Sequence, residues 1–319
     1  MFAHQESNTP KSHIENVQLS LSVKDQYEDK MEYAAVNFVP TIHHDTYDRI
    51  NPSKTDLSGR NVLITGASRG LGKAMAVSYA KAGVSGIALL ARSDLSAVES
   101  EIHEVAQKAG HSSPKILRVK ADATDRASVE KAAEEIASAF DSIDILVNNA
   151  GYLETFKPWA DTDPDEWWKV FEVNVKGVYL TTRSFLPLVL KSKEKTLVMV
   201  SSIGGVATRA GASGYQTTKT VVLRLNDFLM AEYGQQGLLA YGIHPGGVMT
   251  ELAKVMPKEL HGNLQDTPEL AGDTLVFLTA ERREWLADRY ISVNWDVDEL
   301  VSKKDEIVKN DLLKVRLRF

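Results

Sequence analysis

Cysteine is absent from all 319 residues of this chain. Its absence excludes disulfide bonds, a thiolate nucleophile and cysteine-ligated zinc, and it fits a reducing compartment. Long apolar runs are also missing, because no stretch approaches the roughly 20 residues that a membrane-spanning helix needs. The first residues, Met1 to Ser7, lack the basic and apolar regions of a signal peptide. We therefore expect a soluble, cytoplasmic protein with no membrane partner.

Basic residues are fewer than acidic residues in this chain. The chain has 37 Lys and Arg against 43 Asp and Glu, a net charge of −6, so no nucleic-acid partner is predicted. His43 and His44 stand beside Asp45, but no third or fourth ligand follows at a spacing diagnostic of a metal site. A surface histidine pair without metal is the favoured interpretation. The 43% of hydrophobic residues is enough to bury the core of one large domain.

Short apolar runs and amphipathic stretches alternate from residue 60 onward. The apolar runs predict buried strands at 61–65, 86–91, 115–120, 143–147, 195–201 and 238–244, with a last strand from Tyr290 to Val293. The amphipathic stretches predict helices near 70–83, 95–109, 125–139, 165–190, 213–233 and 268–280. Such alternation builds a parallel sheet covered by helices on both faces. The predicted fold class is α/β: one Rossmann-type domain with a doubly wound parallel sheet.

Both ends of the chain fall outside this pattern. Residues 1–58 form a predicted N-terminal extension, with disorder expected for the polar residues 1–30. Residues 31–50 are predicted to dock on the domain or on a neighbouring subunit, because aromatic and aliphatic residues interrupt the polar ones: Tyr33, Phe38, Val39, Ile42 and Tyr47. The catalytic domain is expected at 59–297, followed by a charged helical tail at 298–319.

A glycine-rich turn follows the first predicted strand. Thr65-Gly-Ala-Ser-Arg-Gly-Leu-Gly72 precedes an alanine-rich helical pattern. Glycines let the backbone approach a pyrophosphate, and the N–H groups and dipole of the helix attract the anion. The spacing differs from the common Gly-x-Gly-x-x-Gly fingerprint and from the P-loop of nucleoside triphosphatases. A turn that binds no ligand is the alternative, and the strand before it and the helix after it disfavour that interpretation.

Tyr215 and Lys219 stand four residues apart, and Ser202 ends an apolar run before them. Residues four apart lie on one face of a helix, so the phenol and the ammonium can point into one cleft. The phenol can exchange a proton with a carbonyl or alcohol oxygen, and we expect the nearby cation to lower its pKa from about 10. The alternative for the pair is an exposed position on a helix surface.

These motifs, in this order, resemble those of the short-chain dehydrogenase/reductase family. The matching residues are Thr65-Gly-x-x-x-Gly-x-Gly72, Asn148-Asn-Ala-Gly151, Asn174, Ser202, Tyr215-x-x-x-Lys219 and Pro245-Gly-x-Val-x-Thr250. The resemblance covers roughly residues 59 to 295. It implies a homodimer or a homotetramer. The usual glycine-rich last strand is replaced by residues 288–298, which puts the family's oligomer edge in doubt, and we expect the tail to cover that edge or a partner's site.

The resemblance also implies catalytic roles for Asn174, Ser202, Tyr215 and Lys219. Tyr215 would be the acid–base group, Lys219 its pKa tuner and a ribose ligand, and Ser202 the group that polarises the substrate oxygen. Asn174 would kink its helix and anchor a water that links the lysine to solvent. Ser201 is the less favoured serine, because it would face the opposite side of the strand.

The implied cofactor is a nicotinamide dinucleotide. The residues expected to bind it are Gly66, Ser68, Arg69, Gly70, Leu71, Gly72, Arg92, Asp122, Asn149, Ala150, Gly151, Tyr215, Lys219, Pro245, Gly246, Val248 and Thr250. Arg69 and Arg92 would converge on a 2′-phosphate, so NADP(H) is favoured over NAD(H). Asp94 lies three residues beyond the second strand and is interpreted as part of a helix cap rather than as a ribose ligand. Helix capping is the alternative for Asp122, and Asp125 fits that role better.

The predicted function is an NADP(H)-dependent oxidoreductase that transfers hydride between the nicotinamide and a carbonyl or secondary alcohol. The stretch 251–267 resembles the family's substrate lid, and its apolar residues favour a bulky, weakly polar substrate or, alternatively, a packing helix. Two other functions stay open: a cofactor-binding regulator without turnover, and a lyase or epimerase on the same fold.

Overall fold

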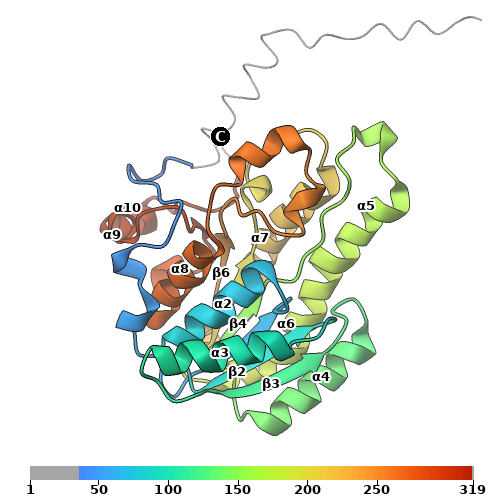
Figure 1. The fold of residues 1–319 in the computed structure, drawn as a ribbon. Helices are drawn as coiled ribbons and strands as arrows, with labels where there is room; N and C mark the ends of the chain where they lie inside the picture. The colour runs from blue at the N-terminus through green and yellow to red at the C-terminus, as the bar shows by residue number, and fades with distance from the viewer. Residues whose placement is uncertain (1–35, 318–319) are drawn as a thin grey trace, which may run out of the picture.

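The computed structural model describes residues 36–317 and contains one seven-stranded sheet in which every strand pair is parallel (Figure 1). The strands are β1 Asn61–Thr65, β2 Gly86–Ala91, β3 Lys115–Lys120, β4 Ile145–Asn148, β5 Thr196–Val200, β6 Leu239–His244 and β7 Tyr290–Ser292. Their order in the sheet is β3-β2-β1-β4-β5-β6-β7. The predicted α/β class and doubly wound sheet are confirmed. The disorder expected for residues 1–30 concerns residues outside the described range.

Helices connect the strands and cover both faces of the sheet. Their bounds are α2 Gly70–Lys81, α3 Ser96–Lys108, α4 Arg126–Ala139, α5 Pro164–Phe171, α6 Val178–Lys191, α7 Ser213–Tyr233, α8 Pro268–Ala280, α9 Val297–Ser302 and α10 Lys304–Lys309. The single helix expected at 165–190 is instead α5 and α6 joined by a π-helical segment, Glu172–Gly177. The wider turn brings the buried side chain of Asn174 to the backbone of Tyr152 and to Thr218, which an unbroken amphipathic pattern does not foretell.

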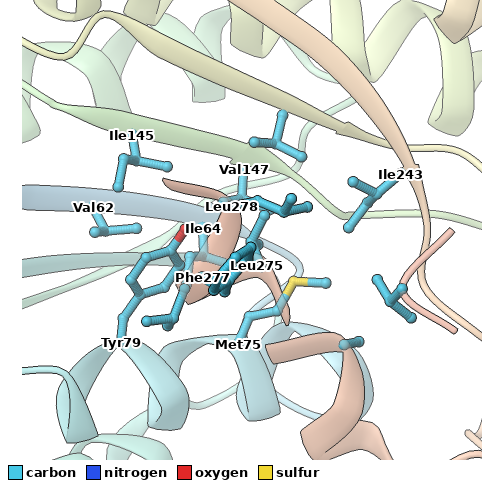
Figure 2. Close-up of a cluster of buried hydrophobic side chains, with 14 of the residues drawn as sticks. Val62, Ile64, Met75, Tyr79, Ile145, Val147, Ile243, Leu275, Phe277 and Leu278 are labelled. Carbon is cyan, nitrogen blue, oxygen red and sulfur yellow. The ribbon is translucent and has the colours of Figure 1, made fainter. Parts of the chain in front are cut away.

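Two apolar layers hold the sheet between its helices. Helices α2, α3 and α8 cover one face, and α4, α6 and α7 cover the other. Alternation along the strands divides the side chains: Val62 and Ile64 face the first layer, and Leu63 faces the second. Figure 2 shows the first layer, where side chains from the strands meet Met75 and Tyr79 of α2. Burial of each such aliphatic side chain stabilises the fold by about 1.5–3 kcal/mol.

The chain direction around β1 locates the ligand edge of the sheet. Strand β1 pairs with β2 on one side and with β4 on the other, so the connections after β1 and β4 leave in opposite directions. A crevice opens at such a switch point beyond the carboxyl ends of the strands. The glycine-rich turn follows β1, and residues 149–151 follow β4 at the same edge.

Residues 36–47 pack against the part of the chain that follows β7. Trp295 is fully buried, its ring centroid lies 5.2 Å from that of Phe38, and its Nε1 donates to the Val36 carbonyl at 3.1 Å. Ile42 forms an antiparallel bridge with Trp295, and Val39 is also fully buried. The extension is therefore part of the folded body of this chain over these residues.

The C-terminal segment lies along β7, which is an edge strand of the sheet. The amide of Tyr290 donates to the Leu313 carbonyl at 2.8 Å, and the Arg289 guanidinium donates to the Leu312 carbonyl at 2.7 Å. An exposed edge strand invites pairing with another chain, and a covered one does not. The tail thus shields this edge within one subunit, and the oligomeric state stays a prediction. Within residues 36–317, no helix is both long and apolar enough to cross a membrane.

Candidate active site

A cleft with a volume of about 230 Å³ lies beyond the carboxyl ends of the central strands. The residues from the sequence prediction that line it are Gly66, Ser68, Arg69, Gly70, Leu71, Gly72, Arg92, Asp122, Asn149, Ala150, Gly151, Tyr215, Lys219, Pro245 and Thr250. The lining does not include Asn174, Ser202, Gly246 or Val248. Most of the predicted positions, from six separate stretches of chain, therefore share one concave site.

The turn after β1 can be built only with glycine at key positions. Gly66 has a φ of +67°, and a β-carbon there would lie 2.9 Å from the Ala150 Cα. A β-carbon on Gly72 would lie 2.4 Å from the Gly66 carbonyl oxygen. Among the described residues, the Arg69 side chain at the N-cap of α2 forms no capping hydrogen bond. The first N–H groups of this helix, which begins at Gly70, are thus left for an anion in the cleft.

The segment after β4 fastens this turn to the centre of the sheet. The Asn149 side chain donates to the Thr65 carbonyl at 2.9 Å, and the Thr65 hydroxyl accepts from the amides of Asn149 and Ala150 at 3.0 Å. Asn148 is buried and donates to the Thr182 hydroxyl at 2.9 Å. The floor of the cleft is therefore rigid around the glycine turn.

The arginines expected to select the cofactor lie at the open end of the cleft. The side chain of Arg92 is 70% exposed, and its nearest carboxylate oxygen, on Asp122, is 3.9 Å away. Arg69 lies in the glycine turn of the same cleft. Asp94 accepts a hydrogen bond from the Ser96 hydroxyl in the first turn of α3 and does not line the cleft. This end of the cleft is lined by the guanidinium groups of Arg69 and Arg92. The Asp94 carboxylate, the candidate for a ribose ligand, lies outside the lining.

Two aspartates beyond β3 take different roles. Asp125 caps α4 and accepts from the Ala127 amide at 2.9 Å, as the sequence favours. Asp122 lines the cleft and accepts from the amide and hydroxyl of Thr124 at 2.9 and 2.8 Å. Burial raises the pKa of Asp122, but the Thr124 hydrogen bonds and the charge of Arg92 outweigh it, and the net shift is downward. Asp122 therefore presents a carboxylate to the cleft.

Tyr215 and Lys219 occupy neighbouring turns of α7, as the four-residue spacing predicts. The Lys219 Nζ lies 5.4 Å from the Tyr215 ring centroid and donates to the Val200 carbonyl at 2.7 Å. Burial raises the pKa of Tyr215 to about 12, a hydrogen bond with Ser202 lowers it, and Glu154 adds to the rise. Burial lowers the pKa of Lys219 to about 8. The expected lowering of the Tyr215 pKa is wrong, because burial of the phenol outweighs every attraction on the phenolate.

The two adjacent serines at the end of β5 face different partners. Ser202 lies at the Tyr215 phenol, whose pKa it lowers, and its hydroxyl accepts from the Gly204 amide at 3.1 Å. The Ser201 hydroxyl is fully buried and donates to the Lys219 carbonyl at 2.7 Å. Ser202 is thus the serine at the phenol, while Ser201 ties the helix to the strand and contributes to the cleft wall.

Asn174 connects the π-helical segment to the catalytic helix. Its Oδ1 accepts from the Tyr152 amide at 2.8 Å, and its Nδ2 donates to the Tyr152 carbonyl at 2.9 Å and to the Thr218 hydroxyl at 3.0 Å. The Thr218 hydroxyl in turn donates to the Tyr215 carbonyl at 2.7 Å. The side chain of Asn174 therefore braces α7, and its water-anchoring role stays a prediction.

The sequence prediction missed Glu154, which contacts the catalytic helix directly. Its side chain is buried, and both carboxylate oxygens lie 3.0 Å from the Tyr215 amide nitrogen. A β-carbon on Gly214 would lie 3.1 Å from Glu154 Oε1 and 3.2 Å from the Trp167 ring, so glycine permits this approach. The glutamate is visible just after the Asn-Asn-Ala-Gly motif, but its partner is 61 residues away. No local pattern links the two.

The turn after β6, residues 245–250, is held by another residue that the sequence did not single out. Asp266 accepts from the Gly247 amide at 2.5 Å and from the Asn294 side chain at 2.8 Å. Its other carboxylate oxygen lies 2.5 Å from Nδ1 of His44 in the extension. His43 and His44 are therefore docked on carboxylates, His43 on that of Asp296, rather than being a free surface pair.

His244, at the end of β6, is a third missed residue beside the site. Its Nδ1 accepts from the Ile203 amide at 3.1 Å, directly after Ser202. Burial lowers the pKa of His244 to about 4, and the nearby Asp266 offsets only part of that shift. The imidazole is thus neutral at neutral pH and serves as a hydrogen-bond acceptor for the strand-end turn.

Known proteins share this arrangement. The family model described as short chain dehydrogenase matches residues 60–260. This chain is a short chain dehydrogenase. The short chain dehydrogenase mpl6 of Monascus purpureus is 49% identical over 284 residues, which cover 89% of this chain and 97% of mpl6. The short chain dehydrogenase andI of Emericella variicolor is 43% identical over 282 residues, covering 88% of this chain and 97% of andI.

Solved short chain dehydrogenase structures superpose on the sheet and its helices. A putative short chain dehydrogenase from Escherichia coli CFT073, crystallised with NADPH, has a TM-score of 0.66 at 30% identity and covers 75% of this chain and 98% of its own. Levodione reductase has a TM-score of 0.67 at 26% identity, covering 74% of this chain and 96% of its own. As a member of this family the chain is an oxidoreductase that uses a nicotinamide cofactor and acts on a small molecule.

Proposed function

We propose that this short chain dehydrogenase is an NADP(H)-dependent oxidoreductase that acts on a carbonyl group or a secondary alcohol of a bulky, weakly polar molecule. The observation that carries the proposal is the continuity of one cleft. An uncapped helix start and two arginines lie at one end, and Tyr215 with Lys219 lies at the other. The cleft therefore combines a place for an anionic dinucleotide with a place for proton exchange.

The residues of the cleft fit a bound NADP(H). Gly66 and Gly72 leave space that a β-carbon would fill, and the start of α2 offers N–H donors to the pyrophosphate. Arg69 and Arg92 suit a 2′-phosphate because guanidinium binds phosphate through two parallel hydrogen bonds. The Escherichia coli relative forms a complex with NADPH, which supports the same preference here. Gly246 and Val248 do not line the cleft. Their role would be to shape the turn that carries Pro245 and Thr250.

The protein groups account for the proton in the reaction. The chemistry that NADP(H) supplies when bound is the transfer of a hydride to or from the substrate carbon. In reduction, Tyr215 donates its phenolic proton to the carbonyl oxygen, which becomes the alcohol. Ser202 hydrogen-bonds the same oxygen, and Lys219 stabilises the phenolate that remains. With a pKa of about 12, Tyr215 is a phenol at neutral pH and is ready to donate.

The substrate class is proposed from the lid stretch. Leu252 lines the cleft, and Val255 is 43% exposed close to it in sequence. Met249, in the preceding turn, is 44% exposed. An apolar rim of this kind favours a substrate with a large apolar surface over a small charged one.

The test is the decay of NADPH absorbance with the purified protein over aldehydes, ketones and quinones of increasing size, with Tyr215→Phe in parallel. Wild type should turn over at least one bulky carbonyl. Tyr215→Phe should lose about 10²–10⁴-fold in kcat while its NADPH fluorescence titration stays unchanged. Turnover that persists in Tyr215→Phe would refute the assignment. Binding of NADPH without turnover of any carbonyl would indicate a role without redox chemistry.

A further inference from the structure

The buried carboxylate of Glu154 lies at the start of the helix that carries Tyr215. Its side chain is only 2% exposed, and both oxygens accept from the Tyr215 amide at 3.0 Å. A buried carboxylate is costly unless hydrogen bonds or opposite charge compensate it. The start of α7 supplies both, because its amides are unpaired within the helix and the positive end of the helix dipole points there.

The segment that carries Glu154 is fixed on its other side as well. The Asn174 side chain binds both backbone groups of Tyr152, at 2.8 and 2.9 Å. The Glu166 carboxylate accepts from the Tyr152 hydroxyl at 3.2 Å and from the Thr155 amide at 3.2 Å. Glu154 is therefore held at one place relative to α7, and the phenol of Tyr215 is held with it.

Glu154 also acts on the phenol by its charge. Burial is the largest cause of the raised pKa of Tyr215, and the negative charge of Glu154 adds to it. The Lys219 Nζ donates to the Val200 carbonyl and lies 5.4 Å from the Tyr215 ring centroid, so its charge acts on the phenol only from a distance. Other ionisable groups around the segment are Glu166 at Tyr152, Lys169 above the Tyr152 ring, and neutral His244 beside Ile203.

We propose that Glu154 is a positioning residue that fixes the start of α7 and keeps the Tyr215 side chain in its protonated, proton-donating form. The kinetic consequence rests on the function proposed above, because only carbonyl reduction consumes that proton. The sign follows from the charge. Without the carboxylate, the phenolate is less disfavoured, so the Tyr215 pKa falls and the phenol ionises at lower pH. Reduction needs the O–H group and is then lost at lower pH.

The experiment compares wild type with Glu154→Gln, which keeps the size and one acceptor oxygen but removes the charge. The first readout is the pH profile of kcat/KM for NADPH-dependent carbonyl reduction. We expect the alkaline limb that belongs to Tyr215, which lies above the one set by Lys219 near pH 8, to move to lower pH in Glu154→Gln. Glu166→Gln is the matched control, because it removes a carboxylate from the same scaffold at Tyr152 instead of Tyr215. Its alkaline limb should coincide with that of wild type.

The second readout needs no substrate. Tyrosinate absorbance is followed at alkaline pH, and the curve of a matching Tyr215→Phe protein is subtracted in each background. Tyr215 should ionise at lower pH in Glu154→Gln than in wild type. Coincident curves and coincident rate profiles would overturn the proposal. If no carbonyl is turned over by wild type, the proposed function fails, while this titration still decides the role of Glu154.

Glu154→Asp covers the case in which the glutamine variant does not fold. It keeps the charge but shortens the reach to the Tyr215 amide. We expect a loss of kcat of several-fold or more with the alkaline limb where wild type has it. An unchanged kcat in Glu154→Asp would overturn the positioning role.

Discussion

The two ends of the cleft are built differently. At the catalytic end, Lys219 and Glu154 are buried and hydrogen-bonded to the backbone of Val200 and Tyr215, and Tyr215 is half-buried. At the adenosine end, Arg92 is largely exposed and its nearest carboxylate is 3.9 Å away. Proton transfer requires atoms that are already in place before the substrate arrives, whereas a phosphate can organise exposed arginines when it binds. The difference indicates where substitutions change chemistry and where they change affinity.

The largest effect is expected at Trp295, which follows the edge strand β7 and is buried beneath the extension. Trp295→Ala removes a fully buried ring that packs against Phe38 of the extension, and it should lower the free energy of unfolding by about 3–5 kcal/mol. Urea unfolding measures this change. Trp159→Ala is the matched control, because that ring is 71% exposed and its loss should change stability by less than about 0.5 kcal/mol. Equal losses of stability in Trp295→Ala and Trp159→Ala would contradict a structural role for the buried ring of Trp295.

Ser202→Ala separates the two serines at the end of β5. It removes the hydroxyl at the phenol and should lower kcat by about 10²–10³-fold, as the loss of an oxyanion donor does. Binding of NADPH should be unchanged. Ser201→Ala is the control: it removes the hydrogen bond from the strand to the Lys219 carbonyl and should lower the free energy of unfolding by about 0.5–1.5 kcal/mol while turnover stays within several-fold. A greater loss of kcat in Ser201→Ala would reverse the assignment.

Arg92→Ala tests the open end. We expect the Kd for NADPH to rise by about 10- to 100-fold, the effect of one charged hydrogen bond, with the Kd for NADH and the kcat nearly unchanged. Fluorescence titration with both cofactors measures the effect. Arg118→Ala, in which the lost guanidinium pairs with Glu99 away from the cleft lining, should leave both constants as in wild type. Equal weakening of NADH and NADPH would speak against a 2′-phosphate contact.

The smallest effect is expected at His44, which joins the extension to the turn after β6. His44→Ala removes the contact with Asp266 but leaves the Gly247 and Asn294 hydrogen bonds in place. The side chain is 60% exposed, so the loss should be within about 1 kcal/mol and the KM for NADPH should rise only a few-fold. Arg49→Ala, an exposed pair elsewhere in the extension, should not change KM. Identical KM values for NADPH in wild type, His44→Ala and Arg49→Ala would show that the His44 contact does not influence the turn after β6.

Much of the fold was predictable because its signals are local. The predicted bounds of β1, β2, β3 and α8 agree with the observed bounds, and the other strands differ by one or two residues at an end. Apolar runs and glycine or proline punctuation are enough to place such elements. The break at Asn174 was expected from the family resemblance alone, because the local pattern reads as one continuous helix and the π-helical segment is stabilised by contacts with Tyr152 and Thr218.

The sequence by itself determined the alternating α/β pattern, the glycine turn, and the spacing that places Tyr215 and Lys219 on one helix face, since each of these depends on neighbours within a few residues. Only the tertiary structure decided that the Tyr215 pKa is raised, that Glu154 lies at the Tyr215 amide, and that Asp266 joins His44 to the turn after β6. The physical reason is the same in each case. Burial and pairing depend on groups far apart in the chain, and only folding brings them within hydrogen-bonding distance.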